Sequence, residues 1–359
     1  MSDNPEEAER EMENAIFISA DCWLNVFDLL PPVQLGHGIA LISRRFDCFV
    51  DEHFKTRKWT FGKLEIRRKN GMNGEKEMQI VNADGNELSI AHKALPNKFI
   101  GFRSISIDFI DQNVLTFLRR FHHRFSSIYT TKLYIRTENV RISEFVVRTI
   151  LPMLKDTICL MDLTTVIFRQ MRQFVPSMLT ECPSLHRVYF NDGILPEFPA
   201  ADDSANVSDG QAVAKWLFST PRPDNLPKML FVQMKHSAVN RWLATVEQIK
   251  AAFSSASSPA VFGISVAFMP FPSLSSVIVP FQLTNEFTGE QLTLSQEHAL
   301  YNGFKLIRSP IAHDDESKLA KASHELKNGE NRIDIWIGDD EVDKGLLDAA
   351  SAGPSGDDH

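Results

Sequence analysis

A strand and a helix recur through the centre of the chain. Short alternating apolar segments begin at steps of 28, 27 and 28 residues, at Ile105, Leu133, Leu160 and Val188. Alternation with a period of two predicts β-strands that bury one face. Between the strands, apolar residues fall at helical spacing, as in 114–125 and 145–154. Because parallel strands are joined by helical crossovers, the pattern predicts an α/β body built from strand–helix units.

A strand–helix unit of this length is typical of leucine-rich repeats. One unit cannot bury its apolar face alone, so we expect neighbouring units to stack into an irregular, leucine-rich-repeat-like α/β solenoid over residues 98–275. The segment 174–188 has the order of such a repeat, with a short helix predicted at 174–179 before the strand. The next step, from Val188 to Leu230, is longer, and we interpret the excess as a loop insertion at 199–210. A doubly wound α/β sheet is the alternative fold.

The regions that flank these repeats have other patterns. Residues 62–92 alternate between Asn-Gly and Asp-Gly turn signals, which predicts a small β-meander. Residues 276–345 predict a β-rich C-terminal cap, with a hairpin around Thr288-Gly289 and two further strands at 304–308 and 333–337. The polar, acidic ends predict a disordered leader over 1–14 and a disordered tail over 346–359.

The net charge of −8 belongs to the ends of the chain. Residues 1–14 carry −5 and residues 311–359 carry −8, which leaves a net charge of +5 on residues 15–310. Within the body, residues 98–148 hold nine bases against four acids, so a polyanion-binding protein that uses this segment is one alternative. Because the helices of a solenoid normally carry solvated charges, we favour an acidic protein partner over nucleic acid.

Cysteine usage and hydropathy indicate the compartment. The four cysteines match no zinc spacing and are too sparse for a disulfide framework, so we expect a reducing, cytoplasmic location, with nuclear entry left open. The acidic start is not a secretory signal. The charge-free stretch 251–285 is interrupted by four prolines, so we predict no membrane segment.

Motifs for catalysis are missing from the sequence. It contains no phosphate-binding loop, no dinucleotide fingerprint and no paired-histidine zinc motif. The segment 263–267 imitates a nucleophile elbow at Ser265, but that motif needs a strand–turn–helix, and here an alternating strand pattern continues. We therefore expect no catalytic residue, no cofactor and no metal ligand.

The segment 15–60 predicts a different kind of unit. Two short amphipathic helices are joined by Pro31-Pro32, which ends the first of them. Ser19 and Asp21 are candidate caps of the first helix. Two short helices form only a small core, so the unit either completes itself on a partner, through aromatic and aliphatic anchors, or packs on the repeats as a cap.

The spacing within 18–50 resembles the F-box, a compact helical module that binds a Skp-type adaptor. The family's opening Leu-Pro is matched by Ile18-Ser19, its middle by Val26-Phe27 with Leu30, and its Asp-Leu by Gln34-Leu35. The segment 42–46, Ile-Ser-Arg-Arg-Phe, follows the final motif almost letter for letter. Ser19 and Gln34 stand where the family has Pro and Asp.

The resemblance extends to a large F-box family expanded in nematodes. It is carried by segments 64–68, 95–102, 198–204, 211–217, 280–294 and 331–335. The tryptophans that the family places among charges at 312–328 are missing here. The resemblance implies a non-catalytic subunit of a Skp–cullin–F-box ubiquitin ligase: the F-box binds the adaptor and thereby the cullin, and the body presents an unknown protein substrate for ubiquitin-dependent proteolysis.

Two sets of candidate residues follow. The adaptor-binding set, whose members either face the adaptor or form the core of the box, comprises Ile18, Val26, Phe27, Leu30, Leu35, Ile42 and Phe46. In a solenoid, strand residues between the buried ones face the concave side, and the substrate-binding set from such positions comprises Tyr134, Arg136, Arg187 and Tyr189. A plain solvated sheet face is the alternative for the second set. An adaptor-independent repeat scaffold is the alternative for the whole chain, and it predicts that deleting residues 15–60 abolishes folding.

Overall fold

The computed structural model describes residues 18–30, 35–56, 59–68, 76–81, 87–89, 99–125, 130–200, 203–218, 227–269, 274, 277–297, 303–311, 332–339 and 342–351. The contacts divide the chain into two compact units. The first comprises Met1–Thr60 with Ala94–Ile100, and the second comprises Phe61–Lys93 with Gly101–His359.

The first unit is helical in its described part. It contains α2 (Ala20–Phe27), a π-helical turn η1 (Leu35–Ile39) and α4 (Arg44–Thr56). Ser19 has extended backbone, and its hydroxyl accepts a hydrogen bond from the Cys22 N–H at 3.3 Å, so it caps α2 as the sequence predicts. Helices are therefore present in both predicted runs, while Pro31-Pro32 lies outside the described residues. We call residues 18–56 the N-terminal module.

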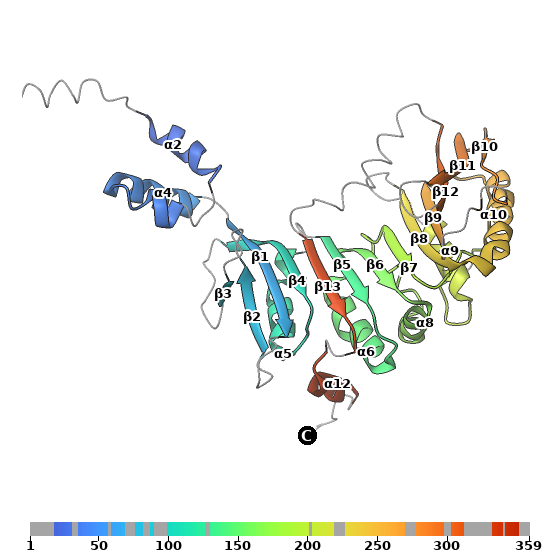
Figure 1. Cartoon of the computed structure of the whole chain (residues 1–359), viewed down its shortest axis with the longest axis horizontal. Helices are drawn as coiled ribbons and strands as arrows, with labels where there is room; N and C mark the ends of the chain where they lie inside the picture. The colour runs from blue at the N-terminus through green and yellow to red at the C-terminus, as the bar shows by residue number, and fades with distance from the viewer. Residues whose placement is uncertain are drawn as a thin grey trace, which may run out of the picture. The chain divides into compact units, whose positions relative to one another are not determined.

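The second unit is built on one sheet. Of the described residues, thirteen strands form it, in the order β10-β11-β12-β9-β8-β7-β6-β5-β13-β4-β1-β2-β3 (Figure 1). The strands are β1 (Trp59–Arg68), β2 (Lys76–Val81), β3 (Glu87–Ser89), β4 (Phe99–Ile107), β5 (Thr130–Ile135), β6 (Ile158–Leu163), β7 (Arg187–Phe190), β8 (Lys228–Lys235), β9 (Phe262–Met269), β10 (Phe281–Asn285), β11 (Glu290–Glu297), β12 (Gly303–Pro310) and β13 (Arg332–Ile337). Because β10 and β3 are at opposite ends, the sheet is open. The predicted α/β class is confirmed.

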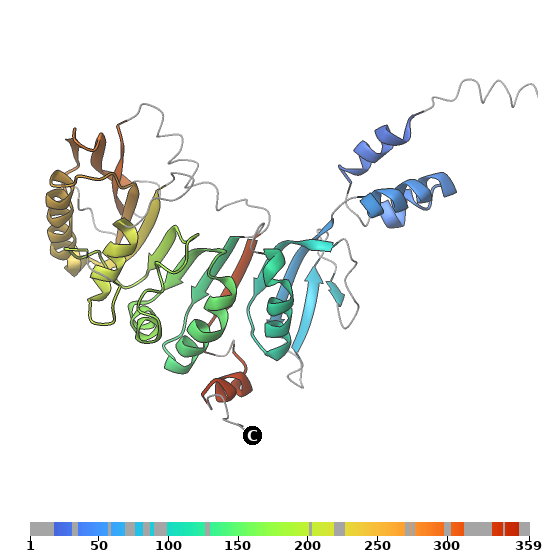
Figure 2. The same cartoon turned by 180° about the vertical axis from the view of Figure 1, so that it is seen from behind.

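The central strands are parallel and have their helices on one face. β4, β13 and β5 to β9 all run in the same direction. Helices α5, α6, α8, α9 and α10 lie on one side of them, as the two opposite views show (Figures 1 and 2). The described helices of this unit are α5 (Gln112–Phe125), α6 (Val140–Phe145), η2 (Val146–Ile150), α7 (Leu151–Leu154), α8 (Thr165–Phe174), α9 (Asp209–Phe218), η3 (His236–Ala238), α10 (Val239–Ser254) and α12 (Lys344–Ser351).

We call the second unit the body. Its core is a continuous row of aliphatic side chains across the sheet. Paired residues in register, all fully buried, run from strand to strand: Ile107, Ile335, Leu133, Met161, Val188, Leu230, Ile264 and Leu306. Strands β5 to β9 follow one another in sequence order without a reversal. A doubly wound sheet would reverse its order and carry helices on both faces, so that alternative does not describe the parallel region.

The C-terminal segments are arranged differently from the single β-rich cap expected over 276–345. Strands β10, β11 and β12 form an antiparallel end of the sheet, joined to β9. Strand β13 instead lies in the parallel region, between β4 and β5. Its isoleucines at 333, 335 and 337 are buried, so the strand completes the core row at a point that local sequence does not indicate.

Two further expectations need correction. The predicted disordered tail starts too early at 346, because α12 extends to Ser351, its Leu347 is buried, and Asp348 forms an ion pair with Arg141 at 2.6 Å. The helix predicted at 174–179 is also wrong: α8 ends at Phe174 and turns follow it. The β-meander is present as the antiparallel strands β1, β2 and β3, which belong to the large sheet.

None of the helices in the described part of the chain has the length and apolar character that crossing a membrane requires.

Candidate functional site

The N-terminal module has a small aromatic core. Phe27, Leu35 and Val50 are almost completely buried, and further apolar side chains pack against them with partial burial: Trp23, Leu24, Leu30, Ile39, Ala40, Phe46 and Phe49. The rings of Trp23 and Phe46 meet edge to face, with centroids 4.8 Å apart. This contact joins α2 to α4. The guanidinium of Arg45 also donates a hydrogen bond to the carbonyl of Ile18 at 3.2 Å, which fixes the start of the module on α4.

The same module exposes large apolar side chains. Leu41 and Ile42, in the turn before α4, have 77% and 63% of their surface exposed. Around α2, the side chains of Ile18, Val26 and Leu29 are exposed as well. Five such side chains among the described residues of one small module make it the first place to look for a contact surface. We call Ile18, Val26, Leu29, Leu41 and Ile42 the apolar set.

The predicted adaptor-binding residues therefore divide into three groups by burial. Phe27 and Leu35 are fully buried, so they form the core of the module and cannot contact a partner directly. Leu30 and Phe46 pack against that core with part of their surface accessible. The other three members, Ile18, Val26 and Ile42, are exposed. Helical spacing places all seven on amphipathic faces but does not tell a buried position from a rim position.

The second candidate site is the face of the parallel sheet opposite the helices, which we call the open face. Register aligns one residue from each of five neighbouring strands there: Trp336, Tyr134, Asp162, Tyr189 and Phe231. The order follows the strands β13, β5, β6, β7 and β8. Because side chains alternate along a strand, these residues point away from the buried aliphatic row.

Two stacked aromatic pairs flank the carboxylate of this row. The rings of Tyr134 and Trp336 are parallel within 5°, with centroids 4.0 Å apart. The rings of Tyr189 and Phe231 are also parallel within 5°, at 4.3 Å. Stacked aromatic pairs add stabilisation beyond their buried area. They also hold the four rings in fixed orientations on the open face.

The Asp162 carboxylate between the pairs is held by two donors. Arg136 Nη2 donates to Oδ2 at 2.7 Å, and Asn191 Nδ2 donates to Oδ1 at 2.9 Å. Burial raises the pKa of Asp162, and the neighbouring Arg136 and Asn191 only partly oppose that change. The carboxylate is therefore shielded within the face, while the guanidinium that pairs with it is more accessible to solvent.

Three of the four predicted substrate-binding residues come together on the open face: Tyr134, Arg136 and Tyr189. Arg187 shares the face but is buried, so it supports the surface rather than forming it. Sequence reasoning missed Trp336, Phe231 and Asp162. Phe231 and Asp162 could have been found from strand alternation, whereas Trp336 required the insertion of β13 beside β5.

Tyrosine ionisation is suppressed on this face. Burial, with the nearby carboxylates of Asp334 and Asp162, raises the pKa of Tyr134 to about 12. Burial also raises the pKa of Tyr189, against the opposing charge of Arg187. Both hydroxyls stay protonated at neutral pH and can donate hydrogen bonds to a ligand.

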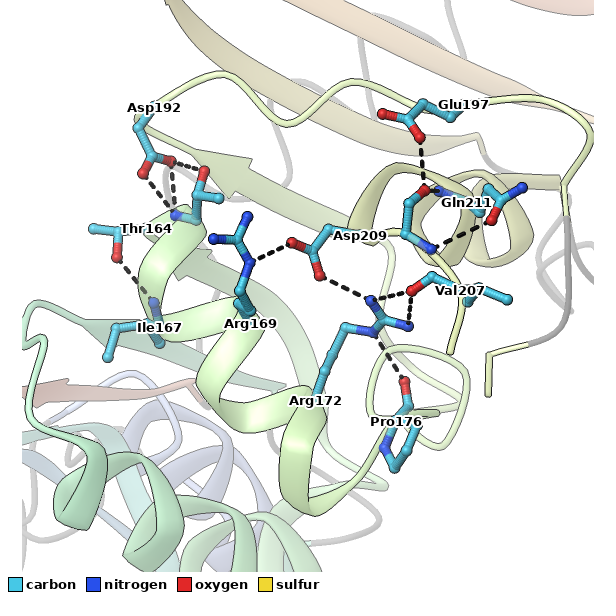
Figure 3. A network of polar contacts seen from close by, with 12 residues as sticks. Thr164, Ile167, Arg169, Arg172, Pro176, Asp192, Glu197, Val207, Asp209 and Gln211 are labelled. Atoms are coloured by element: carbon cyan, nitrogen blue, oxygen red, sulfur yellow. Dashed lines mark hydrogen bonds and ion pairs between the residues drawn. The ribbon is translucent and has the colours of Figure 1, made fainter. Parts of the chain in front are cut away.

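The predicted insertion at 199–210 is fastened to α8 (Figure 3). The buried Arg172 guanidinium donates to Asp209 at 2.8 Å and to the carbonyls of Val207, Ser204 and Pro176. The exposed Arg169 donates to the other oxygen of Asp209 at 3.1 Å. Charged side chains are buried only where such partners are available, so Arg172 organises the described part of the insertion.

Capping bonds position the loop that leaves β7 (Figure 3). The Asp192 carboxylate accepts hydrogen bonds from the N–H and hydroxyl of Thr165 at the start of α8. Ser208 and Gln211 form reciprocal bonds at the start of α9, in the pattern of a capping box. Because Asn191 lies directly before Asp192, this anchoring also holds the amide that contacts Asp162.

The fold does not place Ser265, the candidate nucleophile, in a catalytic geometry. Ser265 lies in the middle of β9, so the strand–turn–helix of a nucleophile elbow does not occur there. Within the described ranges, no cluster of three or more His, Cys, Asp or Glu side chains is placed to hold a metal ion.

The described basic side chains of segment 98–148 do not lie on one face of the structure. Arg141 and Arg148 lie on the helical layer and form ion pairs with Asp348 and Glu144. Arg136 lies on the open face, bonded to Asp162. The side chains of Lys98, Arg103, Arg120 and Arg124 lie outside the described residues. Bases close in sequence are thus divided between two layers.

Comparison with protein-family models, with curated proteins and with solved structures finds no significant match for this chain.

Proposed function

We propose that this chain is a substrate-recognition subunit of a Skp–cullin–F-box ubiquitin ligase. Its N-terminal module is the F-box that binds a Skp-type adaptor, and its body holds a protein substrate. The chain supplies no catalytic group in this role. The observation that carries the proposal is the apolar set, which a compact helical module exposes in the segment whose spacing resembles the F-box.

Energetics favour a protein partner for the module. Fully burying one exposed leucine or isoleucine stabilises a complex by about 1.5–3 kcal/mol before association costs are counted. Leu41 and Ile42 are adjacent and mostly exposed, so a partner that covers both gains from each. Amphipathic helices that present such side chains commonly bind in a groove of the partner.

The body suits the second half of the role. We propose that its strand–helix units are irregular leucine-rich-repeat-like repeats. In such repeats, helices on one face leave the strand face available for binding. The rigid aromatic pairs and Arg136 are of the residue types that dominate protein interfaces.

Co-purification of the full chain with a Skp-type adaptor tests the proposal. The wild-type chain should retain the adaptor, and the double variant Leu41→Asp, Ile42→Asp should lose it, because two buried charges would then face the partner. The matched control is Val277→Asp, Val279→Asp, which changes two exposed valines in the body. That control should retain the adaptor.

Three results would reject the ligase role. The first is no retention of the adaptor by the wild-type chain, and the second is equal retention by the Leu41, Ile42 variant. The third is collapse of the body when residues 15–60 are deleted, since that is what an adaptor-independent scaffold predicts. The ligase role predicts that the deleted chain keeps a cooperative unfolding transition and loses only the adaptor.

A further inference from the structure

In the two ion pairs of the open face, the base is more exposed than the acid. In the Arg136–Asp162 ion pair, 45% of the arginine side chain is exposed and 12% of the aspartate. In the Arg332–Asp334 ion pair, the fractions are 34% and 17%. Both pairs therefore turn the cation toward solvent. A partner that approaches this face meets guanidinium groups before it meets carboxylates.

The charge count on the same strands agrees. Strands β13, β5, β6, β7 and β8 carry five bases and two acids on the open face: Arg332, Lys132, Arg136, Arg187 and Lys235 against Asp334 and Asp162. Of these, Lys132, Arg187 and Asp162 are buried. Burial and the nearby bases Arg332 and Arg187 lower the pKa of the Lys132 amine, although Asp334 opposes this. The exposed guanidinium groups of Arg136 and Arg332, with this excess of bases, make the face complementary to an acidic ligand.

The aromatic pairs give this face a shape suited to a peptide. Adjacent strands lie about 4.8 Å apart, so Tyr134 and Tyr189, two strands apart, are separated by about 10 Å over Asp162. An extended chain that runs along the strands fits between the two pairs. Its apolar side chains would contact ring edges, and its carboxylates would reach Arg136.

Nucleic acid fits these features less well. A base stacks on a free ring face, but each of these rings has one face covered by its partner in the pair. A continuous phosphate backbone would also pass the carboxylates of Asp162 and Asp334. Separate acidic side chains on a peptide can avoid those positions.

We propose that the open face binds an acidic, aromatic-containing peptide segment of the protein substrate, with Arg136 as its main charged contact and Trp336 as its main apolar contact. This inference rests on the proposed function for the identity of the ligand as a substrate. The binding itself can be measured without the adaptor.

Fluorescence anisotropy of the full chain with a fluorescein-labelled copolymer of Glu and Tyr tests the inference. Arg136→Ala and Trp336→Ala should each weaken binding about tenfold or more, as loss of an interface anchor does. Arg136→Glu should weaken it further. Matched controls are Arg148→Ala, an exposed arginine on the helical layer, and Phe287→Ala, an exposed aromatic in the turn before β11. Both should bind as the wild type does.

Four results would overturn the inference. They are no binding of the Glu–Tyr copolymer, equal binding of a Lys–Tyr copolymer, tighter binding of single-stranded oligouridine RNA, and equal loss from Arg148→Ala. Failure here with adaptor binding intact rejects the peptide site alone. Loss of adaptor binding with copolymer binding intact rejects the ligase role alone.

Discussion

Among its described side chains, the N-terminal module buries three apolar ones almost completely and exposes five large ones, whereas the body buries an aliphatic row that crosses the sheet from β4 to β12. The difference lies in size: two short helices have little interior, while stacked strand–helix units share one. The described part of the module therefore leaves apolar surface exposed.

The surfaces that remain accessible differ as well. The module presents aliphatic side chains, and the open face of the body presents paired aromatic rings and arginines. The first kind of surface suits a lasting, largely apolar contact. The second suits a selective contact that depends on charge and shape. The two surfaces thus differ in chemistry, as our proposal of two different partners requires.

The largest expected effect is in the module. Phe27→Ala removes the central ring of a small core, and such a change costs about 3–5 kcal/mol, which is enough to unfold a module of this size. Limited proteolysis should then cleave within 18–56 and leave the body intact. Val26→Ala, at the exposed neighbouring position, should leave proteolysis unchanged. Cleavage throughout the body in Phe27→Ala would show that the two regions are not separate.

A substitution in β13 tests the buried aliphatic row of the body. Ile335 is fully buried between β4 and β5, so Ile335→Ala should lower the free energy of unfolding by about 2–5 kcal/mol. Urea denaturation measures the loss. Trp336→Ala, which removes a stacked ring on the open face, should cost less. Equal, small losses for both would contradict the position of β13 within the core row.

The described part of the insertion allows a buried arginine to be compared with an exposed arginine that bonds to the same carboxylate. Arg172 and Arg169 both bond to Asp209, with 6% and 64% of their side chains exposed. Arg172→Ala should cost about 1–3 kcal/mol, since buried carbonyls lose their donor. Arg169→Ala should cost about 0–1 kcal/mol. Thermal unfolding of both variants compares them, and the reverse order would contradict the network.

The smallest effect is a pH dependence on the open face. The pKa of Tyr134 is raised to about 12 from the usual 10.0, so its neutral form contributes stability that is complete below pH 10 and is lost as pH rises through 12. Ultraviolet titration should show a late-ionising tyrosine that is missing from Tyr134→Phe. A tyrosine spectrum that is complete near pH 10 would contradict the shielding of this face.

Local patterns in the sequence predict much of the body. The two-residue period at Leu133 and Val188 identified β5 and β7, because a buried strand face leaves a direct signature. The position of β13 could not be predicted, since its isoleucines match any buried strand and its neighbours lie far away in the sequence. Trp336 could not be predicted as a residue of the open face for the same reason. In the module, helical spacing could not distinguish the buried Phe27 from the exposed Ile42.

Hydrogen exchange of the full chain with and without a Skp-type adaptor tests the central claim most directly. The account predicts slowed exchange in residues 18–56 on adaptor binding, strongest around Leu41 and Ile42, with no change in β5, β6 and β7. Absence of a complex, or protection of those strands in place of the module, would contradict the assignment of two surfaces to two partners.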